Sequence, residues 1–223
     1  MPKSAVIETY QYLSGSLGRR GAPRDVALGR RVRETVVPRR TRELFVSQVR
    51  LAAERGLTAG TLAEASLRLD EHRLLITAPG SWAAGFGEDD LRIGALHEHK
   101  SLAQEEMPPH ANWHRAIYLA TDAMAVLLSQ PPAALAAAAC RSLPAPELLE
   151  DAARDLGPLA LLEITNPTVS SPDDDGLDFS PLVEGRRALL LPGYGVLSWG
   201  DDLPQAIARA EMVDRWCDVM LKN

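Results

Sequence analysis

The sequence has few aromatic residues, only two cysteines and no long apolar run. Only 5% of its 223 residues are Phe, Trp or Tyr, so aliphatic side chains and alanine must fill most of a core. No apolar run approaches the roughly 18 to 20 residues that span a bilayer, and the first residues contain no apolar signal segment. We therefore expect a globular, cytoplasmic protein with no membrane partner.

The two cysteines, Cys140 and Cys217, both fall in apolar segments with helical periodicity. In a reducing compartment such residues favour buried free thiols over a disulfide. We expect both thiols to be buried in one sizeable domain, which a chain of this length can form.

Charge is unevenly distributed along the chain. Residues 1–42 contain ten basic and three acidic residues, a formal charge of +7. Since the whole chain has a net charge of −6, the remaining residues carry −13. A basic arm of this kind can dock on a protein, a membrane or nucleic acid, or can be a solvated helical surface. Because the acidic remainder would repel phosphates, we expect no nucleic-acid partner. We predict a basic helical extension over 1–39, which a protein partner could bind, and one domain over 40–223.

Hydrophobic periodicity predicts an alternation of helices and strands. Helices are expected over 4–17, 24–37, 40–56, 111–121 and 202–221, with an alanine-rich helix after Pro131 and Pro132. Strands are expected over 64–69, 73–78, 91–96, 123–128, 159–164, 187–192 and 194–199, and a solvated aspartate-rich loop over 165–181. This order predicts an α/β fold with three layers, α/β/α, around a mostly antiparallel central sheet.

Five phrases of the sequence resemble, in order, the motifs of the class II aldolase/adducin family, which includes fuculose-phosphate aldolase and ribulose-phosphate epimerase. They are AAERGL with GTLAEASLRL, LLITAPG, PPHANWHRAIY, AMAVLLSQ and LLLPGYGVLSWGDDLPQA. The resemblance covers about residues 40–221 and implies a class II aldolase-like fold. It also implies a homo-oligomer, often a tetramer in this family, with pockets at subunit interfaces.

The metal-binding positions that the resemblance implies do not carry histidine. In the family three histidines hold a divalent metal that acts as a Lewis acid. The corresponding residues here are Leu128, Gln130 and Tyr194. Leucine cannot ligate, a neutral amide is a weak ligand, and a phenol binds a divalent ion well only when deprotonated. We therefore expect no metal and no other cofactor at these positions.

The resemblance also assigns an acid–base residue and a ligand pocket. The family's catalytic glutamate corresponds to His110, four residues before His114, and histidine can still transfer protons near neutral pH. The predicted pocket residues are Thr61, Glu64, Ser66, Thr77, Gly80 and Gln130. Glu64 replaces a neutral amide, and Pro108 and Pro109 replace two serines, so a sugar phosphate is a disfavoured ligand.

A displaced metal site is an alternative that the sequence leaves open. His97 and His99 would share one face of a strand, and His110 and His114 one face of a helix. If these faces met, four imidazoles could hold zinc. The competing interpretation is that His97 and His99 occupy an exposed turn.

Two hypotheses about function follow, and whether the chain is an enzyme stays open between them. The first is a family member that has lost metal-dependent aldolase or epimerase activity and acts as a binding, regulatory or assembly subunit, as in the adducin branch. The second is a metal-independent or displaced-metal lyase, decarboxylase or isomerase acting on a small carbonyl or carboxylated compound. In that case His110 would be the acid or base, Tyr194 a proton donor and Gln130 an orienting amide.

Overall fold

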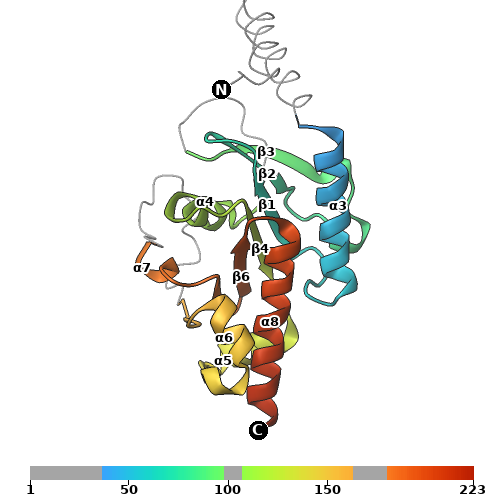
Figure 1. Cartoon of the computed structure of the whole chain (residues 1–223). Helices are drawn as coiled ribbons and strands as arrows, with labels where there is room; N and C mark the ends of the chain where they lie inside the picture. Colours follow the sequence, from blue (N-terminus) through green and yellow to red (C-terminus); the bar gives the residue numbers. More distant parts are fainter. Residues whose placement is uncertain (1–36, 98–106, 163–179) are drawn as a thin grey trace, which may run out of the picture.

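The computed structural model describes residues 37–97, 107–162 and 180–223 and arranges them in three layers (Figure 1). The middle layer is a six-stranded sheet in the order β3-β2-β1-β4-β6-β5, in which every neighbouring pair is antiparallel. The strands are β1 (Glu64–Arg68), β2 (Arg73–Thr77), β3 (Leu91–Ala95), β4 (Ala125–Ser129), β5 (Ala188–Leu191) and β6 (Gly195–Gly200). The predicted α/β class with an antiparallel central sheet is confirmed.

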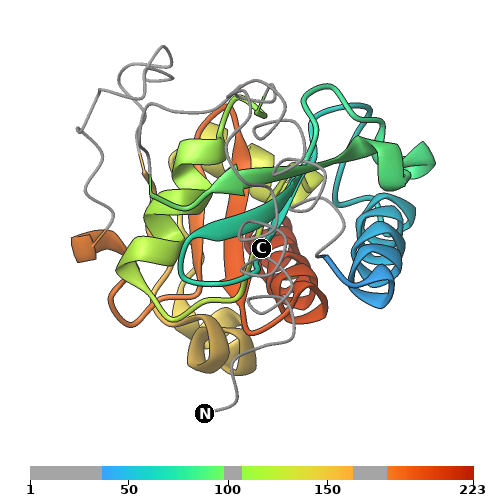
Figure 2. The ribbon, with the colours of Figure 1, turned by 90° about the horizontal axis from the view of Figure 1, so that it is seen from above.

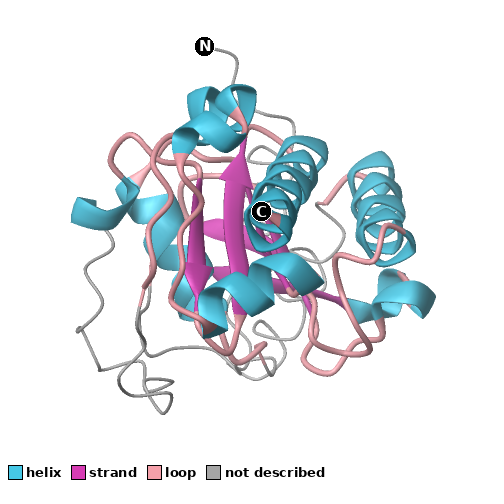
Figure 3. Ribbon diagram, turned by 90° about the horizontal axis from the view of Figure 1, so that it is seen from below, coloured by secondary structure: helices cyan, strands magenta, loops and turns pink. Residues whose placement is uncertain are grey.

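Helices pack on both faces of this sheet (Figures 2 and 3). One face is covered by α3 (Arg39–Glu54), α5 (Pro132–Ala139), α6 (Glu150–Leu156) and α8 (Leu203–Lys222). The other face is covered by α4 (Ala111–Ala120) and α7 (Ser180–Val183). Each face has its own apolar cluster, so the sheet separates two cores.

The strand side chains divide between the two cores by simple alternation. In β1, Ala65 packs in the core of α3, α5 and α8, whereas Glu64 and Ser66 are turned toward α4. In β4, Leu127 joins the first core and Leu128 the second. A buried strand surface that carries polar side chains is unusual, so the face of the sheet beneath α4 is the candidate location of a functional site.

Two local expectations are corrected by the structure. Residues 159–162 do not form the expected strand, because Leu161 is the one residue among them that makes a bridge, to Leu190. The last two residues of the expected strand, 163 and 164, lie outside the described residues. Cys140 is exposed rather than buried, since it caps the end of α5, while Cys217 is a buried free thiol as expected.

Several other expectations concern residues outside the described part. These are the helices over 4–17 and 24–37 (except residue 37), residue His99, and the aspartate-rich loop up to residue 179. No helix within the described residues is both long and apolar enough to cross a membrane.

Candidate functional site

Strand β1 and helix α4 present two rows of polar side chains to each other. Side chains two residues apart on a strand are about 6.6 Å apart, and side chains four residues apart on a helix are about 6 Å apart. Because these two spacings are nearly equal, successive side chains of one row lie opposite successive side chains of the other. Glu64 contacts His110, and Ser66 contacts both His114 and Tyr118.

The first contact joins a buried carboxylate to a partly exposed imidazole. Glu64 Oε1 lies 2.7 Å from Nδ1 of His110, and Glu64 Oε2 accepts from the backbone N–H of His110 over 3.2 Å. Glu64 is 6% exposed, while the His110 side chain is 24% exposed. His110 is the N-cap of α4, where a negative charge is favoured by the helix dipole. Since a carboxylate only accepts, Nδ1 carries the proton and Nε2 is left as the basic nitrogen.

Two aromatic rings surround His110. The ring centroid of Trp113 lies 4.2 Å from that of His110, and the ring of Tyr194 meets it edge-on at 5.2 Å. Trp113 and Tyr194 also contact each other, with centroids 5.0 Å apart. These rings fix the orientation of the imidazole and limit its contact with solvent.

Tyr194 is held in place by the glycines on either side of it in the β5–β6 turn. Gly193 and Gly195 have φ angles of +83° and +111°, which L side chains rarely adopt. At Gly195 a Cβ would also overlap with the carbonyl oxygen of Ser129. The turn therefore depends on close approach of the backbone to the end of β4.

Behind the Glu64–His110 pair lies a fully buried polar chain. Ser66 Oγ is 2.8 Å from Nδ1 of His114 and 2.7 Å from the hydroxyl of Tyr118. Burial is the main cause that lowers the pKa of His114 to about 3, followed by the positive charge that His110 carries when it is protonated and by that of Arg115, so the His114 imidazole is neutral. Burial likewise raises the pKa of Tyr118, which keeps its phenol protonated.

The other predicted pocket residues do not join this cluster. Thr77 Oγ1 accepts from the backbone of Ala65 over 3.3 Å, within the sheet. Gln130 donates from Nε2 to the Leu62 carbonyl over 3.0 Å, and its buried Oε1 has no hydrogen bond to the part of the chain that the structure describes. Thr61 and Gly80 are exposed in loops, and the Thr61 hydroxyl makes no hydrogen bond within the described residues.

The three positions where the resemblance implies metal ligands do not fit a divalent metal. Leu128 is 1% exposed and belongs to the apolar core beneath α4. The Gln130 amide is tied to the Leu62 backbone, and Tyr194 packs against His110 and Trp113. None of the three supplies an anionic or imidazole donor.

The displaced four-histidine arrangement is not assembled in the described part of the chain. His97 is exposed and its ring lies near that of His72, 6.4 Å away, while His99 is outside the described residues. Within residues 37–97, 107–162 and 180–223, no group of three or more His, Cys, Asp or Glu side chains is placed to hold a metal ion.

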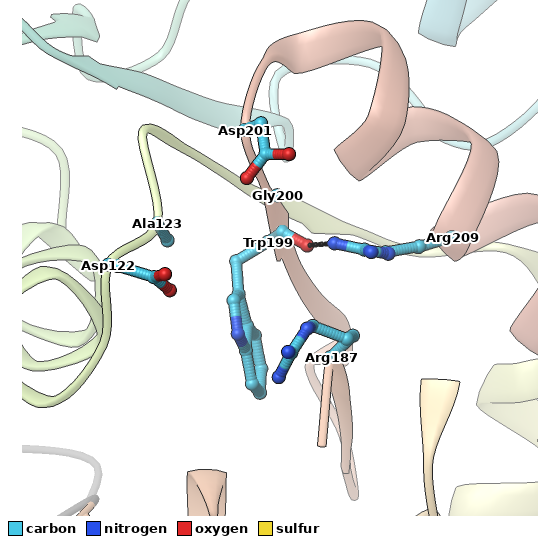
Figure 4. A pocket seen from close by; sticks show the side chains of 7 residues that line it. All are labelled: Asp122, Ala123, Arg187, Trp199, Gly200, Asp201 and Arg209. Carbon is cyan, nitrogen blue, oxygen red and sulfur yellow. Dashed lines mark hydrogen bonds between the residues drawn. The ribbon is translucent and has the colours of Figure 1, made fainter. Parts of the chain in front are cut away.

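A polar hollow lies at the opposite end of the sheet, before β4 begins and where β6 ends (Figure 4). Its volume is about 140 Å³, and it contains none of the predicted site residues. Arg209 donates from Nη1 to the Trp199 carbonyl over 2.7 Å and from Nε to Asp155 over 3.2 Å. These bonds give Arg209 a structural role, because they connect α8 to the end of β6 and to α6.

Two residues of the site, Trp113 and Tyr118, and the link from Ser66 to His114 were missed by reasoning from the sequence. A signal for them exists, because positions 110, 114 and 118 are four apart and lie on one helix face. On β1, positions 64, 66 and 68 similarly share one strand face.

Comparisons with known proteins agree with the fold. The family described as Class II Aldolase and Adducin N-terminal domain matches residues 43–221. YgbL of Escherichia coli has a similar structure, with a TM-score of 0.70 and 19% identity over 81% of this chain and 88% of YgbL. No curated protein sequence gives a significant match.

Two further solved structures have the same architecture. For the L-fuculose-1-phosphate aldolase of Thermus thermophilus the TM-score is 0.67, with 21% identity over 81% of this chain and 92% of the aldolase. For an aldolase II superfamily protein of Pseudomonas syringae it is 0.65, with 21% identity over 86% and 78% of the two chains. At these identities the structural likeness concerns the fold. Together with the family match over most of its length, it shows that the chain belongs to the family of class II aldolases and adducin N-terminal domains.

Proposed function

We propose that this chain is a metal-independent acid–base catalyst built on the class II aldolase fold. Its substrate class would be a small carbonyl or carboxylated compound, and its reaction that of a lyase, decarboxylase or isomerase. The observation that carries the proposal is the 2.7 Å contact between buried Glu64 and partly exposed His110. Burying a carboxylate is costly unless it is paired, so an abandoned pocket would more readily carry neutral side chains there.

The replacements at these two positions are complementary. Where the family resemblance implies a neutral amide and a catalytic glutamate, this chain has Glu64 and His110, so the carboxylate stands at the amide position and an imidazole stands at the acid–base position. Glu64 would hold His110 in the tautomer with Nδ1 protonated, as a carboxylate does for a catalytic histidine elsewhere. His110 Nε2 would then take a proton from the substrate.

Tyr194 is the proposed proton donor, because its ring contacts that of His110. A phenol beside the imidazole could protonate or hydrogen bond a substrate oxygen. Gln130 is a weaker candidate for an orienting role, since one N–H of its amide is already used by Leu62. No step of this proposal passes through a metal.

A second candidate is a binding, regulatory or assembly subunit without turnover. It is supported by Leu128, which fills the core at the position where the resemblance implies a metal ligand. A homo-oligomer, a protein partner for the extension over 1–39 and a cytoplasmic location are compatible with both candidates and are proposed with them.

Deuterium exchange tests the catalytic proposal. The full chain is incubated in D2O with EDTA and either dihydroxyacetone or pyruvate, and loss of the α-proton signal is followed by ¹H NMR. We expect exchange above the buffer rate, reduced about 10²-fold or more in His110→Ala, as for loss of a general base. Tyr194→Phe should also reduce it, and His72→Ala, at an exposed histidine of the β1–β2 turn, should not.

Two results would overturn the proposal. One is exchange that persists in His110→Ala or that requires added divalent metal. The other is an exchange rate for the unmodified chain equal to that of buffer with both probes, which would favour the binding subunit.

A further inference from the structure

We propose that His114 is a positioning residue that orients Glu64 and, through it, the tautomer of His110. The inference rests on the proposed function, because it assigns a role to residues behind the Glu64–His110 pair. The observation behind it is the row of contacts Tyr118–Ser66–His114, whose end lies beside the Glu64 carboxylate.

The directions of the hydrogen bonds in this row follow from counting protons. Among the described residues the buried Tyr118 hydroxyl has Ser66 Oγ as its hydrogen-bond partner, so its proton goes to Ser66 Oγ, since the opposite direction would leave that proton without an acceptor. Ser66 has then accepted one bond, and its proton goes to the one remaining neighbour, Nδ1 of His114. This arrangement leaves no hydroxyl proton in the row without an acceptor.

The same counting fixes the tautomer of His114. Its imidazole is neutral and fully buried, and therefore carries a single N–H. Because Nδ1 accepts from Ser66, the proton is on Nε2. No described residue forms a hydrogen bond with that nitrogen, and its distance to Glu64 Oε2 is 3.9 Å.

A buried N–H that faces a carboxylate at this distance acts mainly through its dipole. Inside a protein such a dipole is weakly screened and stabilises the negative charge in front of it. Glu64 Oε2 therefore faces Nε2–H of His114 as well as the backbone N–H of His110, while Oε1 faces Nδ1 of His110. Because each Glu64 oxygen faces an N–H group, the carboxylate is fixed in its orientation toward His110. It therefore keeps the proton of His110 on Nδ1 and leaves Nε2 of His110 unprotonated.

Nitrogen-15 NMR of the full chain, with labelled histidine, tests this role without any assay of turnover. Protonated and unprotonated ring nitrogens have well-separated shifts. In the unmodified chain we expect the proton on Nε2 of His114 and on Nδ1 of neutral His110. Ser66→Ala removes the donor to His114 Nδ1, so the proton should move partly to Nδ1, and the ring-nitrogen shifts of His110 should change with it.

Ser198→Ala is the matched control. Ser198 is also a buried strand serine, but its hydroxyl donates to the Ala206 carbonyl on the other face of the sheet, so both histidines should keep their shifts. A proton on Nδ1 of His114 in the unmodified chain would overturn the inference, even if Ser66→Ala did not fold. Unchanged His110 shifts in a folded Ser66→Ala variant would also overturn it.

The two proposals fail in different ways. Confirmed tautomers together with deuterium exchange that does not depend on His110 would remove the proposed function and leave the positioning role of His114. Deuterium exchange that depends on His110, together with His114 protonated on Nδ1, would remove the positioning role of His114 and leave the proposed function.

Discussion

Glu64 and His110 are 46 residues apart in the sequence and form a direct contact at the centre of the site, with Oε1 and Nδ1 separated by 2.7 Å. Glu64 is the first residue of strand β1, and His110 is the N-cap of helix α4. Their contact links the sheet to the helix layer, so it should matter for stability as well as for chemistry.

Removal of the Glu64 side chain should destabilise the fold. Glu64→Ala leaves the backbone N–H of His110 and its Nδ1 without their acceptor, which should lower the free energy of unfolding by about 1–3 kcal/mol. Glu64→Gln keeps an acceptor oxygen and should cost less. Urea denaturation measures both, with Glu211→Ala as the control, since its exposed pair with Arg55 is worth about 1 kcal/mol or less. Equal losses in Glu64→Ala and Glu211→Ala would contradict the expectation.

The stability of the protein should fall as the pH drops below about 6.5, in part because of His114. Its pKa is lowered in the fold, so in this range the unfolded chain binds a proton that the folded chain does not. The groups facing it are Glu64, Ser66 and Tyr118, with the charges of His110 and Arg115 nearby.

Replacing His114 tests this dependence. At pH values between about 6.5 and the folded value of about 3, His114 contributes a slope of up to about 1.4 kcal/mol per pH unit to the free energy of unfolding. His114→Gln should be less stable at neutral pH but should lose stability less steeply on acidification. A parallel pH dependence of the two proteins, from denaturation at a series of pH values, would show that His114 titrates normally in the fold.

The two glycines that flank Tyr194 should differ in their tolerance of alanine. Both have positive φ, so each substitution should cost about 1–2 kcal/mol from backbone strain. Gly195→Ala should cost at least about 3 kcal/mol in total, because its Cβ also meets the Ser129 carbonyl, whereas Gly193 has open space around it. Thermal unfolding of the two variants compares them directly, and a smaller loss for Gly195→Ala would argue against this turn geometry.

Chelation should leave the protein unchanged. A metal bound only to the folded state would stabilise it, and its removal would lower Tm. Since Leu128, Gln130 and Tyr194 do not supply suitable donors, we expect Tm with EDTA to equal Tm without it. The measurement uses protein purified without chelator, together with elemental analysis. Stoichiometric zinc, iron or manganese, accompanied by a fall in Tm on chelation, would contradict the expectation.

The order of the elements was determined by the sequence alone. Helical and strand periodicities are local properties, and they predicted α3, α4 and α8 and all six strands within a few residues. The motif positions were local as well, so the sequence alone identified Leu128, Gln130 and Tyr194 as the residues at the positions where the resemblance implies metal ligands.

Local patterns were less reliable where the outcome depends on what surrounds a segment. The apolar run 159–164 predicted a strand, but only the bridge from Leu161 to Leu190 forms within its described residues. The apolar surroundings of Cys140 predicted burial, but the helix ends there and the thiol is exposed. A strand needs a partner edge and burial needs a covering layer, and neither is encoded in a short window of sequence.

Only the tertiary structure decided what the site contains. The sequence assigned Glu64 to a ligand pocket and His110 to acid–base chemistry, as separate residues. The structure pairs them and adds Ser66, His114 and Tyr118 behind them. The physical reason is a match of spacings: two residues along a strand and four along a helix cover nearly the same distance, so polar rows on β1 and α4 meet once the fold lays one across the other.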